Sequence, residues 1–453
     1  MSQTQPRPFP PLHAFRSPVP SRKAETPSLG EGDEATDGRR TGVSNKPRKS
    51  PGRRLSAVVM LFYLLAFLLL AAKEHDRMGY ILAFAVPLMI FLGTNLIPHL
   101  FPADRLLLSL TNFLCAMGVL LLYDTNPSYA LQQAVAYGVG LAAMIFCIYL
   151  IRLVHSWRRI IWALIPVSLL LLCMPLLLGR EINGARNWVV IGAVSFQPSE
   201  IVKLSLVLVL AWFLSIRKQL PWILFSVLCL VLLMLQRDLG TALLYYTSAL
   251  LLFWASSGNL PAVLLGVAGG AGAARFGYRQ FAHVRRRVAV WRDPWADPDN
   301  AGYQLIQGLT AIAEGGLWGT GLGLGNPTSI PVYESDFIFA VLCEQFGIVM
   351  GFCVLFMYAA LIWRGTSVAV SARRGFHGLL AMGCTVLLGL QTFVIIGGVL
   401  KLIPLTGVTL PFISYGGTSL VSSMCLVGMI QGVESLNEDD ISLDARLSML
   451  ERG

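Results

Sequence analysis

The sequence predicts an all-α polytopic membrane protein with about twelve transmembrane helices. Hydrophobic residues make up 55% of the 453 residues and charged residues only 13%, whereas soluble domains carry about a quarter charged residues. The apolar residues come in runs long enough to cross a bilayer as helices. The predicted spans are 55–73, 79–98, 105–123, 130–151, 158–179, 199–216, 220–236, 239–255, 260–275, 337–363, 378–400 and 408–433.

Residues 1–54 differ in composition from everything that follows. They contain nine prolines, eleven Lys/Arg and five Asp/Glu. Such a segment cannot bury enough apolar area to offset its ordering entropy, so we expect a disordered, basic, cytoplasmic tail. The first apolar run starts at Leu55, too late for a signal peptide. After the tail, we expect a first helix pair at 55–98, a transmembrane core at 99–433 with a large extracytoplasmic loop at 276–336, and a cytoplasmic C-terminal tail at 434–453.

Basic residues in the short loops predict the orientation. Arg53 and Arg54 precede the first span, and further arginines and lysines follow the fourth, sixth and tenth spans. All of them lie on one side of the membrane if the N-terminus is inside, so both termini are predicted to be cytoplasmic. These loops also explain the net charge of +10. Nucleic acid is not an expected partner, because binding it requires a basic face exposed to water.

The predicted outer loop departs from this charge rule. Long loops cross the membrane whatever their charge, so simple tolerance is one explanation. The other is an anion site at the outer surface, because guanidinium groups bind phosphate or diphosphate oxygens bidentately. Six arginines lie within eighteen residues at the start of this loop: Arg275, Arg279, Arg285, Arg286, Arg287 and Arg292.

Polar segments interrupt the apolar background at four places. The first contains GARNW at 184–188 and FQPSE at 196–200, followed by Lys203. Glu200 and Lys203 are three residues apart on a predicted span and so share a helix face. Ionisable groups at membrane depth face a partner or a water-filled cavity, which leaves a structural ion pair and a functional site as alternatives. The second segment, QRDLGT at 236–241, is a polar turn between two spans.

The third polar segment is the outer loop itself, which includes DP…GYQ, the glycine-rich run at 315–325 and SDFIFA at 335–340. The glycine-rich run follows no strand and lacks a P-loop lysine, so we expect a compact, flexible surface loop and no nucleotide site. Asp336 lies at the edge of an apolar span, where helix capping and catalysis both explain it. The fourth segment, 403–419, places prolines and paired glycines at membrane depth, which is tolerated where the backbone packs in protein or lines a cavity.

Together these segments resemble the SEDS family (shape, elongation, division and sporulation; FtsW/RodA/SpoVE-like). The matches GARNW…FQPSE…K, QRDLGT, DP…GYQ…GGLWGTGLG…SDFIFA and PLTGVTLPFISYGGTSL occur in the family's order over roughly residues 104–433. The resemblance implies an inverting peptidoglycan glycosyltransferase of the bacterial plasma membrane. Its substrate would be lipid II, an undecaprenyl-diphosphate-linked donor that it polymerises into β-1,4-linked strands during division, elongation or sporulation. A class B penicillin-binding transpeptidase would be its partner. Members usually have ten spans, so the helix pair at 55–98 would be additional.

The resemblance also implies which residues form the site. Asp336 aligns with the family's essential aspartate and is the expected base, and Lys203 is expected to be catalytic and to face the same cavity. The sequence departs from the family at Glu334-Ser335, which replaces His-Thr, and at Gln345, which replaces a second acid. The expected substrate-binding residues are Arg186, Trp188, Glu200, Arg285, Arg286, Arg287, Tyr303, Gln304, Ser414 and Tyr415.

Two other functions remain open at the level of sequence. A lipid II flippase would also use buried charges and broken helices, and a non-catalytic scaffold would only bind a transpeptidase. A candidate base on the outer side, where the substrate sugars lie, favours the polymerase. The chain has no HExxH or CxxC pair, so no protein metal site is predicted. The sequence indicates no cofactor and leaves a requirement for a divalent cation open.

Overall fold

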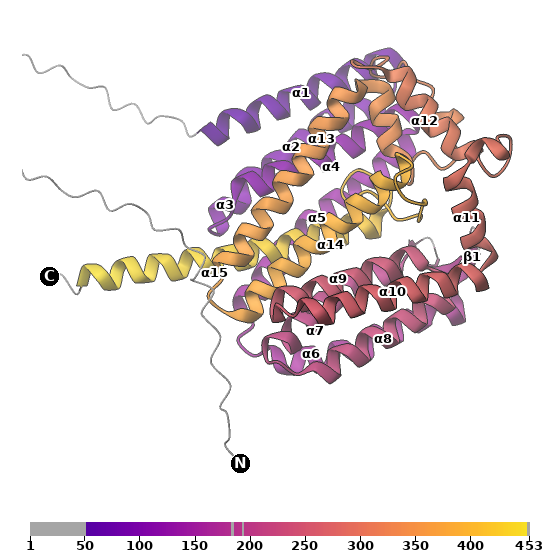
Figure 1. The fold of residues 1–453 in the computed structure, drawn as a ribbon. Helices are drawn as coiled ribbons and strands as arrows, with labels where there is room; N and C mark the ends of the chain where they lie inside the picture. Colours follow the sequence, from indigo (N-terminus) through magenta and orange to yellow (C-terminus); the bar gives the residue numbers. More distant parts are fainter. Residues whose placement is uncertain (1–50, 183–184, 193, 451–453) are drawn as a thin grey trace, which may run out of the picture. The chain divides into compact units, whose positions relative to one another are not determined.

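The computed structural model describes residues 51–182, 185–192 and 194–450. Residues 1–50 of the tail predicted at 1–54, and Gly184 of the first motif, lie outside these residues. Residues 51–54 begin helix α1, so the predicted disorder is wrong for this part of the tail. Helices dominate the described chain, as predicted (Figure 1). They are α1 (Pro51–Glu74), α2 (Arg77–Phe91), α3 (Ile97–Leu100), α4 (Arg105–Thr125), α5 (Pro127–Leu153), α6 (Trp157–Leu178), α7 (Pro198–Ser215), α8 (Gln219–Leu235), α9 (Leu239–Ser257), α10 (Leu260–Gln280), α11 (Ala282–Arg292), α12 (Tyr303–Gly315), α13 (Ile338–Ser371), α14 (Gly375–Val399) and α15 (Gly417–Leu450).

Within the described ranges, eleven helices are long and apolar enough to cross a membrane, against about twelve predicted. The difference is α8, which is apolar but has only 17 residues. At 1.5 Å per residue it spans about 26 Å, close to the lower limit for a membrane helix. A π-helical turn at Leu92–Leu96 joins α2 to α3, and together they form one span.

Several predicted boundaries are wrong. The last span begins at Gly417 instead of residue 408, because the preceding segment contains Pro404 and Pro411 and forms no helix. The same helix continues to Leu450, so the described part of the predicted C-terminal tail is helical. Helix α10 runs on to Gln280, so the predicted outer loop starts inside a helix. That loop also contains two helices of its own, α11 and α12.

A small antiparallel sheet, which the sequence analysis did not predict, lies between α6 and α7. Strand β2 (Ala185–Ile191) pairs with β1 (Arg180–Ile182) on one side and with β3 (Val194–Phe196) on the other. Val189 pairs with Phe196, close to the start of α7. The sheet therefore fixes Asn187 and Trp188 of the first motif relative to the helix that carries Glu200.

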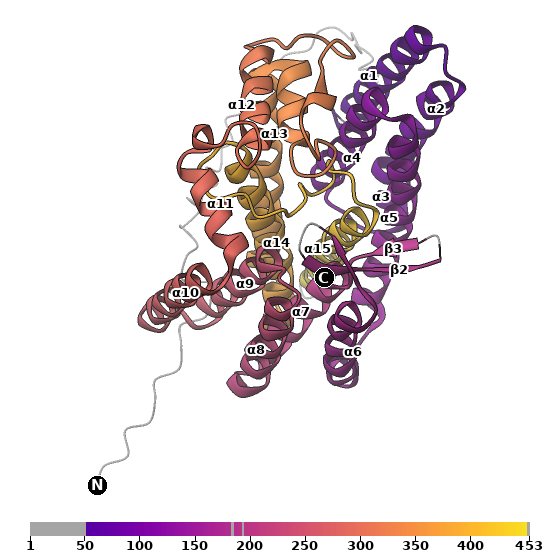
Figure 2. The same cartoon turned by 90° about the vertical axis from the view of Figure 1, so that its right-hand side faces the viewer.

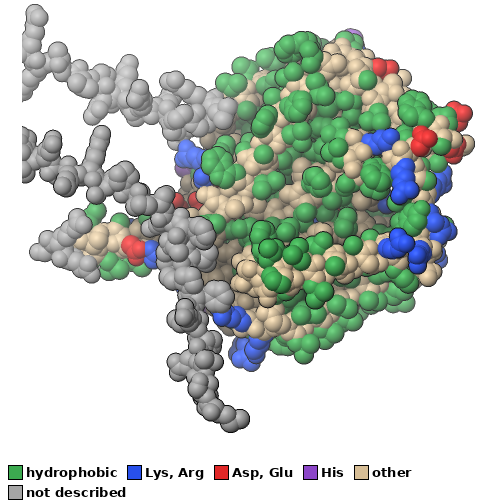
Figure 3. Space-filling model, in the orientation of Figure 1, with side chains coloured by type: hydrophobic (Ala, Val, Ile, Leu, Met, Phe, Trp, Pro, Cys, Tyr) green, Lys and Arg blue, Asp and Glu red, His purple; other side chains and the backbone are tan. Residues whose placement is uncertain are grey.

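The core lies along α4, α7 and α15, whose membrane spans are 78%, 72% and 83% buried within the protein. Helix α5 packs along α15, and α14 contacts α7, α9 and α13 (Figures 1 and 2). By contrast, only 6% of the α10 span is buried. The hydrophobic side chains on the surface form a broad zone, and the Lys and Arg side chains visible in this view lie towards its two ends, near α11 on one side and near the start of α1 on the other (Figure 3). This distribution is typical of a protein embedded in a bilayer.

Helix α13 is broken at Gly347, where φ is 78° and ψ is 169°. A Cβ there would lie 2.2 Å from the carbonyl oxygen of Leu317, so only glycine fits. The glycine-rich run fills the break: the amides of Thr320 and Gly321 donate to the carbonyls of Glu344 and Gln345, at 2.8 and 3.1 Å. These bonds satisfy backbone groups that the break leaves open. The run is compact, as predicted, but these bonds hold it against α13, unlike the flexible surface loop that was expected.

Candidate functional site

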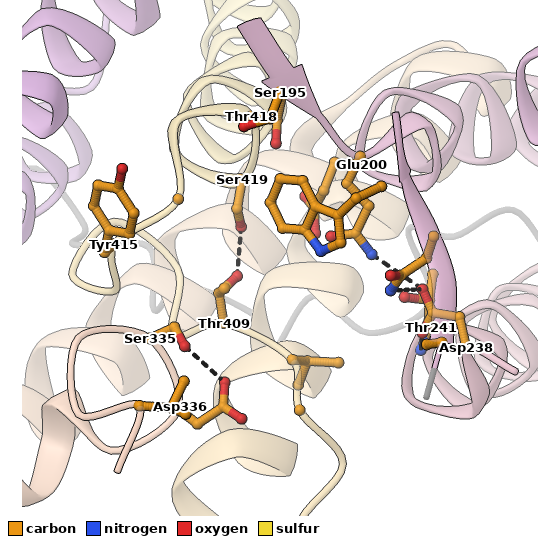
Figure 4. A pocket seen from close by; sticks show the side chains of 18 of the residues that line it. Ser195, Glu200, Asp238, Thr241, Ser335, Asp336, Thr409, Tyr415, Thr418 and Ser419 are labelled. Atoms are coloured by element: carbon orange, nitrogen blue, oxygen red, sulfur yellow. Dashed lines mark hydrogen bonds between the residues drawn. The ribbon is translucent and has the colours of Figure 1, made fainter. Parts of the chain in front are cut away.

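The four polar segments meet around one cavity of about 740 Å³. The cavity lies at the end of the bundle where α7 and α9 begin and α15 starts, and Figure 4 shows Glu200, Asp238, Asp336 and Tyr415 around it. Each polar segment contributes lining residues, although they are far apart in the sequence. The lining includes Asn187, Trp188, Gln197, Glu200, Arg237, Asp238, Thr241, Arg287, Glu334, Ser335, Asp336, Gly407, Thr409, Tyr415 and Ser419.

Asp336 reaches the cavity from a turn that precedes α13. Its amide donates to the carbonyl of Val332 at 3.2 Å, and its Oδ1 accepts a hydrogen bond from Ser335 Oγ at 3.0 Å. The N-cap residue of α13 is Phe337, and no side chain caps this helix end. The capping alternative for Asp336 is therefore wrong. The carboxylate remains available to the cavity.

The surroundings of Asp336 favour a carboxyl group that exchanges its proton near neutral pH. Desolvation by the surrounding protein raises the pKa of Asp336 to about 6, although the Ser335 hydroxyl and Arg287 oppose this shift. A nearby carboxylate, Glu334, adds to it. A Cβ built on Gly407 would lie 3.6 Å from Arg287 Nη2 and 3.8 Å from Asp336 Oδ2. The base candidate and this guanidinium therefore border the same small space.

The fourth polar segment holds the Asp336 turn in place. Ser414 Oγ donates to the carbonyl of Ser335 at 2.5 Å and accepts from the amide of Leu410 at 2.8 Å. The amide of Tyr415 donates to the carbonyl of Glu334 at 2.8 Å. Ser414 is buried behind the cavity, whereas the Tyr415 ring lines it. Of these two predicted substrate-binding residues, Ser414 therefore positions Asp336, and Tyr415 is available to a ligand.

Asp238 lies in a different wall of the cavity (Figure 4). Its Oδ1 accepts from the amide of Thr241 at 3.1 Å and so caps α9. Its Oδ2 accepts from Asn187 Nδ2 at 3.1 Å and Gln197 Nε2 at 3.0 Å. Asp238 thus joins the first two polar segments, although the sequence analysis did not select it as a site residue. The available signal was an aspartate immediately before an apolar helix, which is typical of an N-cap.

Lys203 and Glu200 form the structural ion pair that was one of the alternatives. Lys203 Nζ lies 2.5 Å from Glu200 Oε2 and donates to Gln391 Oε1 at 3.1 Å. Ser422 Oγ also donates to Glu200, at 2.7 Å. Glu200 lines the cavity, but Lys203 is 3% exposed and is not a lining residue. The expectation that Lys203 faces the same cavity as Asp336 is therefore wrong, because Glu200 takes up its ammonium group.

The predicted arginines occupy different positions. Arg287 lines the cavity and donates through Nη1 to the carbonyl of Thr406 at 2.8 Å. Arg285 donates to the carbonyl of Arg279 at 2.7 Å instead. Neither Arg285, Arg286 nor Arg186 is a lining residue. A residue that was not selected, Arg237, does line the cavity.

Two more predicted residues lie outside the cavity lining, at the start of α12. Gln304 Nε2 donates to the carbonyl of Pro331 at 2.9 Å, just before the Asp336 turn. Tyr303 begins the helix and is 37% exposed. Gln304 therefore supports the turn from behind, and we assign Tyr303 no contact with the cavity. Within the described part of the chain, no three His, Cys, Asp or Glu side chains are grouped as metal ligands.

The fold and this cavity define a multi-pass helical membrane protein with a desolvated carboxyl group at a polar site. The family model for FtsW, RodA and SpoVE, described as "Cell cycle protein", matches residues 105–438. The chain belongs to this family. The match begins at α4 and leaves out α1, α2 and α3.

Curated relatives cover most of the chain. The peptidoglycan glycosyltransferase RodA of Mycobacterium tuberculosis (strain H37Rv) is 33% identical over 361 residues, which is 72% of this chain and 77% of the relative. Stage V sporulation protein E of Bacillus subtilis (strain 168) is 34% identical over 360 residues, covering 73% and 96%. The probable peptidoglycan glycosyltransferase FtsW of Halorhodospira halophila is 35% identical over 326 residues, covering 67% and 81%.

Solved structures show the same fold. A chain from a peptidoglycan synthase complex, studied for the coordination of polymerization and crosslinking, aligns with a TM-score of 0.63 and 30% identity. The alignment covers 74% of this chain and 98% of that chain. The rod shape determining protein RodA of Thermus thermophilus aligns with a TM-score of 0.56 and 29% identity, with the same coverage.

Proposed function

We propose that this peptidoglycan glycosyltransferase polymerises lipid II with Asp336 as its general base. The class of enzyme follows from the family and from relatives that carry this name. The observation that carries the proposed role is the position of Asp336. Its carboxyl group borders the cavity where all four polar segments meet, does not cap α13, and has a pKa raised to about 6.

The chemistry requires a base and a cationic environment. The acceptor is a sugar hydroxyl, a weak nucleophile until its proton is removed, and a positioned carboxylate can take that proton in the transition state. The new bond joins this oxygen to the anomeric carbon of the donor, and the bond from that carbon to the lipid diphosphate breaks. Because the donor is α-linked and the product β-linked, one inverting displacement suffices.

Arg287 and Arg237 are the best-placed cations for the lipid diphosphate, because both line the cavity. Guanidinium groups bind such oxygens bidentately and stabilise charge that grows on the leaving group. Nearby, burial and the charges of Arg287 and Arg237 lower the pKa of His283. Burial is the larger cause of this shift, and the two guanidinium groups add to it because they lie near His283. Arg285, Arg286 and Arg186 would act on the approach of the substrate instead.

We further propose that the cavity faces the outside of the bacterial plasma membrane, with both termini cytoplasmic. The start of α1 and the end of α15 lie at the same end of the bundle, and α11 and α12 lie at the other (Figure 1). The positions of basic residues in short loops support the same orientation. In cells, an Ala296→Cys variant should react with a membrane-impermeant thiol reagent. Labelling only after permeabilisation would show that the protein has the opposite orientation.

The proposed partner is a class B penicillin-binding transpeptidase. The support is the structural similarity to a chain of a peptidoglycan synthase complex in which polymerization and crosslinking are coordinated. Co-purification with candidate transpeptidases from the same cell would test it. An enzyme that polymerises at full rate alone, and binds none of them, would contradict the proposed partnership.

The deciding experiment uses purified full-length protein with lipid II, alone and with candidate transpeptidases, followed by a gel for glycan strands. Wild-type protein should produce polymer, and Asp336→Asn should produce none, because the amide keeps the shape but cannot accept the proton. Asp299→Asn, at an exposed aspartate of the same segment, is the matched control and should remain active. If Asp336→Asn forms polymer at the wild-type rate, Asp336 is not the general base. Lipid II transport without polymer would favour a flippase.

A further inference from the structure

We infer that Lys73 of α1 is a positioning residue, through which the additional N-terminal helices hold the glycine-rich run and the first half of α13. The inference rests on the proposed function only where it concerns catalysis. Helices α1 and α2 lie outside the family-matched region 105–438. Their role in this chain is therefore not given by the family core, and their contacts with that core are informative.

The helix pair is packed tightly on α4. Tyr63 Oη donates to the carbonyl of Phe113 at 2.8 Å, and the rings of Phe67 and Tyr123 lie 5.9 Å apart. A Cβ on Gly79 would lie 2.2 Å from Tyr123 Oη, so α2 also approaches this helix closely. Because close-packed interiors transmit displacement, the end of α1 is fixed relative to the end of α4.

Lys73 extends from this fixed helix end to the glycine-rich run. Its Nζ donates to the carbonyl of Gly323 at 2.5 Å. A Cβ built on Gly323 would lie 3.1 Å from Lys73 Nζ and 2.9 Å from Asp124 Oδ1, so ammonium and carboxylate meet at this glycine. The residue has a φ of 75°, which side chains rarely adopt. The contact therefore depends on a glycine at this position.

The same cluster continues into α13. Asp124 Oδ2 accepts from Gln345 Nε2 at 2.5 Å. The amide of Asn326 donates to Glu344 Oε1 at 2.6 Å, while Oε2 of this buried carboxylate has no hydrogen-bond partner among the described residues. Two carboxylates thus lie near one another, and the ammonium of Lys73 offsets part of their repulsion.

These contacts lead to the site. Glu344 and Gln345 belong to the short half of α13 that ends at Gly347 and begins beside Asp336. This half-helix is separated from the remainder of α13 by the break, so the run that fills the break fixes its position. A displacement of about 1 Å at a reacting group can cost about 100-fold in rate. Releasing Lys73 should therefore slow the chemical step through Asp336, without touching the substrate.

The test compares Lys73→Met, Lys73→Arg and Gly323→Ala in the full-length protein, with Arg77→Gln as the matched control. Arg77 is an exposed cation at the same end of the helix pair. Lys73→Met should lower kcat about tenfold and leave KM for lipid II unchanged, because only the positioning is lost. Lys73→Arg should recover most of the rate, since it retains a cationic donor.

Amide hydrogen exchange provides the readout that does not depend on activity. In Lys73→Met and Gly323→Ala, exchange should accelerate in peptides covering 316–326, which include the Thr320 and Gly321 amides that bond to the carbonyls of Glu344 and Gln345. Peptides from α5 and α15 should keep their protection. Unchanged exchange over 316–326 in Lys73→Met, or an equal loss of protection throughout the chain, would overturn the inference. A wild-type protein without polymerase activity would refute the proposed function, while this exchange result would still decide the role of Lys73.

Discussion

Two walls of the cavity each present an aspartate, and the two are held very differently. Asp238 accepts three hydrogen bonds, from Thr241, Asn187 and Gln197, and it caps a helix. Asp336 accepts one from its neighbour Ser335 and caps nothing. A carboxylate whose lone pairs are occupied by hydrogen bonds has a structural role. One that is desolvated and sparsely bonded keeps the capacity to take a proton.

Substituting each aspartate in turn should show the largest difference between the catalytic role of Asp336 and the structural role of Asp238. Asp336→Asn should reduce polymerisation about 1000-fold, within the range expected for a lost general base. The Tm at neutral pH should stay the same or rise, because the folded state no longer holds a desolvated charge. Asp238→Ala should lower the free energy of unfolding by about 3 kcal/mol, because it removes a helix cap and two further, part-buried hydrogen bonds. Thermal unfolding in detergent and the glycan gel measure the two effects. A large fall in Tm for Asp336→Asn would make Asp336 a structural residue as well.

The second comparison is between Arg287, which lines the cavity, and Arg285, which does not. Arg287→Gln should lower kcat/KM about 100-fold, because one guanidinium beside the leaving group is lost. Arg285→Gln should change kcat/KM no more than about threefold and mainly alter its dependence on salt. Steady-state polymerisation at two ionic strengths separates them. Equal losses from both substitutions would mean that the whole arginine cluster binds the diphosphate.

The sequence could predict the helical fold and Asp336 because both depend on local patterns. Apolar runs identify spans, and the motif around Asp336 is continuous in the chain. It could not predict the partner of Lys203, because Glu200 and Asp336 are both carboxylates and only the packing decides which one is near. The position of Arg237, and the way the glycine-rich run fills the break at Gly347, also depend on contacts between distant segments.

The pH dependence of the polymerisation rate should distinguish titration of Asp336 from general unfolding of the protein. With the pKa of Asp336 near 6, the active carboxylate form falls about tenfold for each pH unit below that value, so the rate at pH 5 should be about a tenth of its maximum. The stability changes in the opposite direction. The folded-state pKa lies above the unfolded value, so Asp336 favours the folded state most below about pH 4 and loses this contribution as the pH rises through 6.

Rate and thermal unfolding, measured from pH 4.5 to 8, would check this. The rate should fall at acidic pH while the fold persists. In the Asp336→Asn protein, the stability change between roughly pH 4 and 6 should become smaller. A rate that falls only where the protein unfolds would show that Asp336 does not set the profile.

Substitution of Lys203 should have the smallest effect on polymerisation, because Lys203 contacts Glu200 and does not line the cavity itself. Lys203→Met leaves the half-buried Glu200 carboxylate beside Ser422 without its cation, so a favourable charge interaction is lost. We expect a fall in polymerisation of about fivefold, corresponding to roughly 1 kcal/mol of coupling, and a lower Tm. The double variant Lys203→Met/Glu200→Gln removes both charges and should recover much of the Tm, since no charge is left unpaired. If Lys203→Met instead abolishes polymer while the Tm stays at the wild-type value, the ammonium acts in the reaction itself, and the ion pair seen here is only one of its states.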